Sequence, residues 1–153
     1  MPMETINLAA SELLPHRRGM LLTDEALCGD ETGIVGRATV KADNLFARNG
    51  SIGSWVLIEY MAQTMAMWTS WNARQKGLPP PVGFLLGTRR LDLLTEHVAV
   101  GSVLTCKASR IFVSVEDGVA QFQCEAYCNG QLLAKAAINA FEPKNIESFL
   151  TEH

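Results

Sequence analysis

The chain has 153 residues, of which 48% are hydrophobic and 19% are charged, and its net charge is −3. A chain of this length buries roughly 68–70% of its unfolded surface, which is enough for a core without disulfides or metals. The apolar content argues against intrinsic disorder, and the slightly acidic balance provides no basic surface for nucleic acid or anionic membranes. We therefore expect a single folded domain over residues 1–153.

Several features of composition bear on compartment and cofactors. The first 14 residues contain no basic segment followed by an apolar run, so no secretory signal peptide is expected. The four cysteines include no CxxC pair and the three histidines are scattered, which favours buried reduced thiols. Cys124 and Cys128 would share a face of a strand, so a metal pair there is the alternative. We expect a cytoplasmic protein with no metal and no cofactor.

Glycines and prolines divide the chain into elements. The expected elements are a helical turn over 11–14, two strands within 20–42 around a turn at 29–33, an irregular segment over 42–54, one long helix from Ser54 to Lys76, and strands over 82–94, 102–115, 118–128 and 131–143. Two hairpin turns join the last three strands, one over 116–118 and one at Asn129 and Gly130, a pair typical of a type I′ turn.

The order of these elements predicts an α+β fold in which the long helix covers an antiparallel sheet. The helix is apolar nearly all round, through Trp55, Met61, Met65, Trp68 and other large side chains. Such a helix is either wrapped by a curved sheet or also buried by a second subunit. A membrane span is the rival interpretation, but polar residues interrupt an apolar stretch that is shorter than ~20 residues.

Glu59 is the one charged residue between positions 51 and 73. A carboxyl group surrounded by apolar side chains favours its neutral form, which suits general acid–base chemistry near neutral pH. The structural alternative is a wet glutamate at the rim of the helix, or one paired with Arg48 or Arg89. Gln63 lies one turn later and either orients Glu59 or is satisfied elsewhere in the fold.

The segment NGSIGSW, residues 49–55, delivers small residues into the first turn of this helix. Unpaired backbone amides at a helix start can donate to a carbonyl oxygen or an oxyanion, which makes Ser54 and Trp55 candidate substrate-binding residues. Small side chains in this segment let a substrate approach the backbone closely, and Asn49 and Gly50, just ahead of the helix, are further candidate substrate-binding residues. The structural alternative is a capping loop with Ser51 or Ser54 at the N-cap.

Four stretches of the sequence resemble one family. LLPHRRGMLLTDEAL, residues 13–27, is similar to the opening of the hot-dog-fold 3-hydroxyacyl-acyl-carrier-protein dehydratases, and VLIEYMAQT, residues 56–64, is similar to their central helix. FLLGTRRLDLL and VAVGSVL resemble a later strand and turn more weakly. The pattern is closest to the divergent branch associated with aryl-polyene pigment biosynthesis. The resemblance implies a hot-dog fold and a dimer, and the predicted element order agrees with it.

The resemblance also implies a mechanism. In these dehydratases a histidine removes the C2 proton of a 3-hydroxyacyl thioester, an acid on the central helix expels the hydroxyl group as water, and helix-start amides hold the thioester carbonyl. The acid corresponds to Glu59 and the neighbouring glutamine to Gln63. The histidine, 14 residues before the acid, corresponds to Leu45, and leucine cannot accept a proton.

Four interpretations follow from the missing histidine. In the first, a related hot-dog subunit supplies the histidine across a dimer interface. In the second, His16 reaches the site, although the family has a histidine with a structural role at that position. In the third, the chain is a thioesterase in which Glu59 activates water, and in the fourth it is a non-catalytic subunit that shapes an acyl tunnel. Substrate on acyl carrier protein or coenzyme A is expected, giving a trans-2-enoyl thioester in fatty-acid or polyene synthesis.

The remaining charged residues give weaker signals. Two arginine pairs, at Arg17 and Arg18 and at Arg89 and Arg90, could receive a phosphopantetheine phosphate or an acidic carrier helix, or be ordinary surface residues. His97 is expected to be exposed in a turn before a strand, and His153 is terminal.

Overall fold

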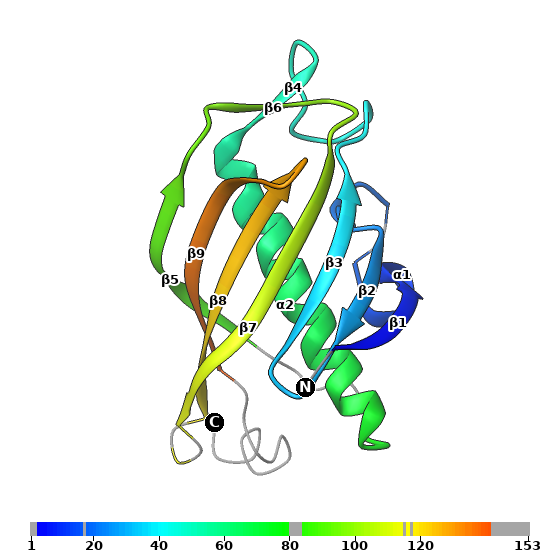
Figure 1. Ribbon diagram of the computed structural model, residues 1–153, viewed down its shortest axis with the longest axis vertical. Helices are drawn as coiled ribbons and strands as arrows, with labels where there is room; N and C mark the ends of the chain where they lie inside the picture. The colour runs from blue at the N-terminus through cyan, green and yellow to red at the C-terminus, as the bar shows by residue number, and fades with distance from the viewer. Residues whose placement is uncertain (1–2, 17, 80–83, 115, 117, 142–153) are drawn as a thin grey trace.

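A computed structural model describes residues 3–16, 18–79, 84–114, 116 and 118–141 of the chain. Over these residues, seven strands form an antiparallel sheet that curves around one long helix (Figure 1). The strands, in their order across the sheet, are β1 (Glu4–Ala9), β2 (Glu25–Gly29), β3 (Gly33–Thr39), β7 (Val103–Ser114), β8 (Val119–Cys128), β9 (Gln131–Phe141) and β5 (Phe84–Leu93). The architecture is the predicted one.

The long helix consists of a 3-10 turn, η2 (Ser54–Val56), followed by α2 (Leu57–Gln75). It packs against β3, β7 and β8, the middle of the sheet. Trp68 and Phe122 meet edge to face in this layer, with ring centroids 5.6 Å apart, and both are buried. Alternate residues of β8 and β9 that face the helix are small, mostly alanine and cysteine, so the bulky helix side chains fit against them.

The helix is not buried on every side within this chain. Ile58, Ala62, Ala66 and Thr69 recur at spacings of three or four residues and are only partly buried. The helix is apolar nearly all round, as predicted. The sheet buries one face of it, and the rest of the chain covers the other face only in part.

The predicted strands and turns of the second half are present where they are described. Asn129 and Gly130 have φ values of 52° and 78°, the positive values that a type I′ hairpin requires at both central positions. The hairpin predicted at 116–118 joins β7 to β8, with Asp117 outside the described residues. The predicted helical turn near Pro15 is α1 (Ala10–Leu13), and a 3-10 turn, η1 (Arg18–Met20), follows it.

The irregular segment predicted over 42–54 is partly wrong. Its end forms β4 (Ser51–Gly53), which pairs with β6 (His97–Ala99) in a small sheet above the main one (Figure 1). His97 consequently starts a strand, although it is exposed as expected. Strands of three residues have too few positions to show an alternating pattern. The first strand, β1, was also not predicted, because a bulge and a positive φ at Asn7 interrupt its regular alternation.

Two further findings concern membranes and metals. No helix among the described residues is long and apolar enough to cross a membrane. The same part of the chain contains no group of three or more histidine, cysteine, aspartate or glutamate side chains that could hold a metal ion. Cys106 and Cys124 are buried free thiols, and Cys28 and Cys128 are partly buried free thiols.

Candidate active site

Glu59 lies in the first turn of α2, and its side chain is exposed. The expectation that apolar surroundings within this chain bury the carboxyl group is therefore wrong. The apolar neighbours in sequence, Leu57, Tyr60 and Met61, point to the sheet, whereas Glu59 lies on the opposite side of the helix. No hydrogen bond or ion pair of Glu59 occurs among the described residues, so neither Arg48 nor Arg89 neutralises it there.

Gln63 is buried, with 3% of its surface exposed, and its carboxamide is bound to the segment that precedes β2. Its Oε1 accepts hydrogen bonds from the backbone N–H of Leu22 at 3.0 Å and from the N–H and hydroxyl of Thr23 at 3.3 Å. Its Nε2 donates to the Met20 carbonyl at 2.7 Å. Of the two roles predicted for Gln63, satisfaction elsewhere in the fold is the one observed: it ties segment 20–23 to the helix one turn from Glu59.

Of the two backbone amides predicted to bind substrate at the start of the helix, one is used within the fold and the other is not. The Ser54 amide donates to the Glu96 carbonyl at 2.9 Å, so it is not available to a substrate in this chain. The Trp55 amide lies in the first helical turn, where an N–H has no acceptor within the helix. The Trp55 indole is 58% exposed and lies one turn before Glu59 on the same face. Trp55 is thus the better placed of the two predicted donors.

A loop between β3 and β4 carries Leu45 and is held in place at several points. The Asn44 Nδ2 donates to the Tyr60 hydroxyl at 2.8 Å, and the Asn44 Oδ1 accepts from the Phe46 N–H at 2.8 Å. Phe46 meets Trp55 edge to face, with ring centroids 5.7 Å apart. The loop therefore connects the core helix to the helix start.

Leu45 itself is 51% exposed and rests on Gly19. A Cβ added at Gly19 would lie 3.0 Å from Leu45 Cγ, closer than most real contacts. Met20, next along the chain, is 56% exposed. Met20, Leu45 and Trp55 are three exposed large apolar residues at this end of the molecule, and we call them the apolar rim.

Asn49 and Gly50 form the tip of an exposed two-residue turn between Arg48 and Ser51. Their φ values are 53° and 81°, and the backbone N–H groups of Arg48 and Ser51 each donate across the turn, at 2.8 and 3.2 Å. A type I′ turn accounts for this dipeptide by itself. Substrate binding at these two residues stays a prediction.

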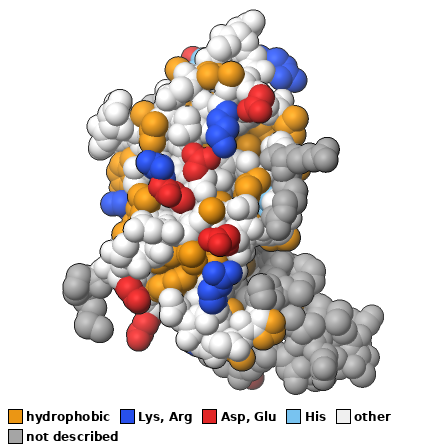
Figure 2. Space-filling view, turned by 90° about the vertical axis from the view of Figure 1, so that its right-hand side faces the viewer, with side chains coloured by type: hydrophobic (Ala, Val, Ile, Leu, Met, Phe, Trp, Pro, Cys, Tyr) orange, Lys and Arg blue, Asp and Glu red, His pale blue; other side chains and the backbone are white. Residues whose placement is uncertain are grey.

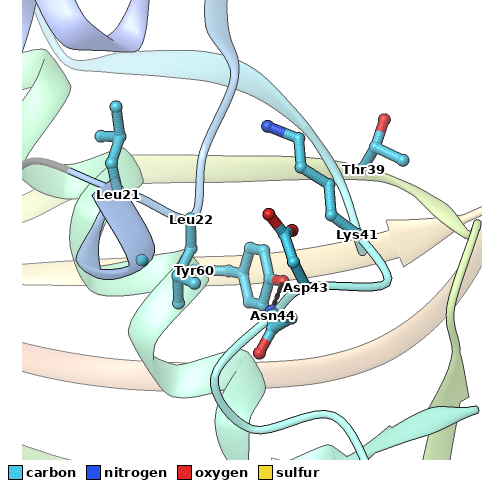
Figure 3. Close-up of a pocket in the computed structure, with 8 residues that line it drawn as sticks. Leu21, Leu22, Thr39, Lys41, Asp43, Asn44 and Tyr60 are labelled. Carbon is cyan, nitrogen blue, oxygen red and sulfur yellow. Dashed lines mark hydrogen bonds between the residues drawn. The ribbon is translucent and has the colours of Figure 1, made fainter.

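A cavity of about 280 Å³ lies between segment 19–22, the end of β3 and α2 (Figure 3). Its lining is Gly19, Leu21, Leu22, Thr39, Lys41, Asp43, Asn44 and Tyr60. Lys41 forms an ion pair with Asp24 at 3.0 Å. Desolvation raises the pKa of Tyr60 to about 12, helped by the nearby Cys106 thiol and Asp24, so the phenol is neutral at physiological pH. Sequence patterns do not indicate this Asn44–Tyr60 pair, because the two residues are 16 positions apart and meet only in the folded chain.

The remaining candidates lie apart from this arrangement or outside what is described. His16 is partly buried in the connection between α1 and η1. Arg89 and Arg90 are exposed on β5, where Arg90 binds Asp92 at 2.8 Å. Arg17 and the side chain of Arg18 lie outside the described residues. On the face shown in Figure 2, basic and acidic side chains are interspersed and form no extended basic patch.

The fold resembles that of several proteins of known structure. The dehydratase heterocomplex ApeI:P from Xenorhabdus doucetiae superposes with a TM-score of 0.81 at 24% identity, covering 95% of this chain and 98% of that one. The smu.793 protein of Streptococcus mutans UA159, bound to acetyl CoA, has a TM-score of 0.64 at 12% identity over 84% and 94% of the two chains. The E. coli PaaI protein from the phenylacetic acid degradation operon has a TM-score of 0.59 at 16% identity over 76% and 80%. The chain has the hot-dog fold that was predicted.

A comparison with protein-family models assigns the chain to one family within this fold. The model of the ApeP-like family, described as ApeP dehydratase, matches residues 8–151. The chain therefore belongs to the ApeP-like dehydratase family, which confirms the predicted resemblance to the aryl-polyene branch of the dehydratases. No curated protein sequence matches the chain.

Proposed function

We propose that this chain is a subunit of a dehydratase that converts 3-hydroxyacyl thioesters to trans-2-enoyl thioesters, with Glu59 as the acid. The observation that carries the proposal is the position of Glu59, an exposed carboxyl group in the first turn of the central helix, one turn after the Trp55 amide. Family membership supports the reaction class. A carboxyl group and a carbonyl-binding amide on one helix face are two of the three groups that the reaction needs.

The proposed reaction divides its proton transfers between two groups. A base removes the C2 proton, and the electron pair left on C2 forms the C2–C3 double bond. The C3–O bond breaks as the Glu59 carboxyl group gives its proton to the departing hydroxyl, which leaves as water. The Trp55 N–H donates to the thioester oxygen while negative charge accumulates there. Proton transfer from the base back to Glu59 restores the starting state.

The third group, the base, is proposed to come from another subunit. By the resemblance, the position of the catalytic histidine in this chain is Leu45, which cannot accept a proton. The three side chains of the apolar rim are 51–58% exposed. A group of exposed apolar side chains around a site is typical of a surface that another subunit covers. A subunit that covers this face would also exclude water from the site around Glu59. We propose a heterodimer with a related hot-dog subunit that supplies the histidine.

The test is reconstitution. The chain alone, the related subunit alone and the pair are assayed with a 3-hydroxyacyl thioester of acyl carrier protein, the proposed carrier, and of coenzyme A, the alternative. Enoyl formation is followed by absorbance and mass. We expect the pair to exceed either subunit alone, and sedimentation to show no stable monomer at micromolar concentration. If the chain alone is as active as the pair, the proposal that the partner subunit supplies the histidine is wrong, and His16 becomes the candidate base.

Two other functions are separated by the same assay. A lone carboxylate at a helix start also suits a thioesterase, in which Glu59 would activate water or attack the acyl carbon. That reaction releases free thiol without an enoyl product. Absence of both products with any partner would favour a non-catalytic subunit. Roles for Asn49, Gly50 and Gln63 in substrate binding or catalysis, a place in aryl-polyene synthesis and a cytoplasmic location belong to the proposal as well.

A further inference from the structure

The small sheet of β4 and β6, at one end of the molecule, has a buried face and an outer face (Figure 1). Ile52 and Val98 lie opposite each other on the buried face, with 0% and 4% of their surfaces exposed. Since neighbouring residues of a strand point to opposite sides, the residues before and after these two point outward. The outer face of the small sheet therefore carries Ser51, Gly53, His97 and Ala99.

Arg48 adds a positive charge to this outer face. It pairs with Ser51 across the tight turn, and residues opposite each other in an antiparallel pair share a face. Its Nη1 donates to the Leu45 carbonyl at 3.2 Å and to the Ala47 carbonyl at 2.7 Å, which hold the side chain in one place although it is exposed. Arg48 forms no ion pair with any residue that the structure describes, so its charge is available to a ligand.

Trp55 and His97 lie beside each other on the same face. A Cβ added at Gly53 would be 2.4 Å from the Trp55 Nε1, so the indole lies over Gly53. His97 is directly opposite Gly53 on β6, which places its Cβ about 5 Å from that same point. Both side chains are exposed. The outer face thus brings together a fixed guanidinium, an exposed indole and an exposed imidazole.

Nearby acidic groups limit the kind of ligand that fits. Glu59 is exposed in the first turn of α2, and Glu96 is exposed and precedes His97 in the chain. Asp43, in the same loop as Arg48, lines the cavity between segment 19–22 and α2. A fully anionic ligand would be repelled at its Glu59 end, whereas an anionic group near Arg48 and His97 would be attracted. The surface therefore fits a ligand that is neutral at one end and anionic at the other.

We propose that the outer face of the small sheet binds the phosphate of the phosphopantetheine arm that carries the acyl thioester. Arg48 and His97 donate hydrogen bonds to the phosphate oxygens, and the arm passes the Trp55 indole. The inference rests on the proposed function, because it takes the ligand to be an acyl thioester, and it names the residues that recognise the carrier.

The arm is long enough to join the two ends of this surface. The Arg48 Nη1 is 3.2 Å from the Leu45 carbonyl oxygen, and the ring centroid of the next residue, Phe46, is 5.7 Å from that of Trp55. With about 7 Å of covalent structure between that oxygen and the Phe46 ring, the guanidinium lies at most about 16 Å from the indole. The roughly thirteen bonds from phosphorus to sulfur in the arm span up to about 15 Å. A thioester at the Trp55 amide and a phosphate at Arg48 can therefore belong to one molecule.

The experiment compares two probes with the same hexanoyl chain in amide linkage, one on pantetheine and one on 4′-phosphopantetheine. Binding to the full chain is measured by calorimetry at low ionic strength. We expect the phosphorylated probe to bind about 3- to 10-fold more tightly, a modest effect because Arg48 and His97 are exposed. The preference should decrease in about 0.5 M salt, which screens exposed charges.

Two variants and a control assign the preference to this face. Arg48→Gln removes the positive charge and should reduce the preference to near unity. His97→Gln should reduce it in part, and it keeps the inference testable if Arg48→Gln disturbs the loop. Arg74→Gln is the matched control, because Arg74 is exposed and donates to a backbone carbonyl, that of Glu12 at 3.0 Å, at the other end of α2. It should keep the preference.

Coenzyme A and acyl carrier protein both contain the phosphopantetheine arm, so two further probes carry the amide-linked hexanoyl chain on each. Both should bind less tightly to Arg48→Gln than to the wild type. A loss confined to the carrier-protein probe, with equal binding of the pantetheine and phosphopantetheine probes, would mean that Arg48 contacts the acidic surface of the carrier protein. That result would contradict the inference.

Fluorescence shows where the probe binds. Of the three tryptophans, Trp68 and Trp71 are 1% and 5% exposed and Trp55 is 58% exposed, so quenching by acrylamide reports mainly on Trp55. We expect the phosphorylated probe to reduce this quenching. Binding that leaves the quenching unchanged would place the probe elsewhere and overturn the inference.

The outcomes separate this inference from the proposed function. No probe has a 3-hydroxyl group or a thioester, so none can be dehydrated or hydrolysed at that bond, and binding does not depend on the reaction. Equal binding of the pantetheine and phosphopantetheine probes by the wild type, failure of both to bind, or an unchanged preference in either variant overturns the inference and leaves a dehydratase intact. A preference that Arg48→Gln removes, in a chain that forms no enoyl product with any partner, supports the phosphate site and overturns the dehydratase.

Discussion

Replacing Gln63 with methionine tests whether one side chain holds the approach to the site against the central helix. The substitution keeps an unbranched side chain of similar length but removes the carboxamide. The Leu22 amide, which is buried, then loses its 3.0 Å bond, and the Met20 carbonyl loses its 2.7 Å bond. The Thr23 bonds at 3.3 Å are long and contribute less.

The magnitude follows from these contacts. Two hydrogen bonds of ordinary length contribute about 1 kcal/mol each, and a buried amide left unpaired adds about 1–2 kcal/mol. We therefore expect Gln63→Met to lower the free energy of unfolding by about 3–4 kcal/mol, which corresponds to roughly 6–16 °C in the melting temperature of a chain of this size.

The assay is urea unfolding at one fixed protein concentration, because association with a second subunit would change the apparent stability. Gln75→Met is the matched control, since Gln75 lies on the same helix and is exposed. A stability of Gln63→Met equal to that of Gln75→Met would refute the view that the carboxamide fastens segment 20–23 to the helix.

Three further predictions concern other parts of the fold. Burial raises the pKa of the Cys106 thiol from 9.0 to about 12, so above pH 9 the unfolded chain loses this proton before the folded chain does, and the free energy of unfolding falls. In urea titrations, Cys106→Ala should make this fall shallower between pH 9 and 11. An equal dependence on pH in the variant and the wild type would exclude the thiol as its cause. Gly130→Ala places a Cβ at a φ of 78° and should cost about 1–2 kcal/mol in the same measurement. In Gly53→Ala the new Cβ would overlap the Trp55 indole, so the near-ultraviolet circular dichroism of the aromatic pair should weaken; an unchanged spectrum would mean that the indole does not rest on Gly53.

The sequence predicts elements well where the pattern is local. The long helix, the strands around residues 29–33 and the Asn129–Gly130 turn depend on periodicity and turn chemistry within a few residues, and the structure has them. β4 and β6 were missed because their pairing joins residues more than 40 positions apart and each is three residues long.

The site was predicted less well, for a physical reason that concerns Glu59. A one-dimensional pattern shows that a residue is surrounded by apolar neighbours in sequence but not which side of the helix those neighbours occupy. The apolar residues near Glu59 include both those that the sheet buries, such as Met61, and those of the face that stays partly exposed, such as Ile58. Gln63 and Asn44 likewise bind groups that only the folded chain brings near, so their partners could not be read from spacing.

In the proposed dehydratase, Glu59 supplies the proton that expels water, in a site that another subunit completes. The measurement is the rate of enoyl thioester formation by the reconstituted pair, with the wild-type chain and with Glu59→Gln. Glutamine keeps the shape of the side chain but cannot donate the proton as an acid does, so we predict a fall of about 10²- to 10⁴-fold with folding intact. Glu12→Gln, at an exposed position on α1, should leave the rate unchanged. A rate in Glu59→Gln equal to that of the wild type would remove Glu59 from the mechanism and contradict the proposed dehydratase site.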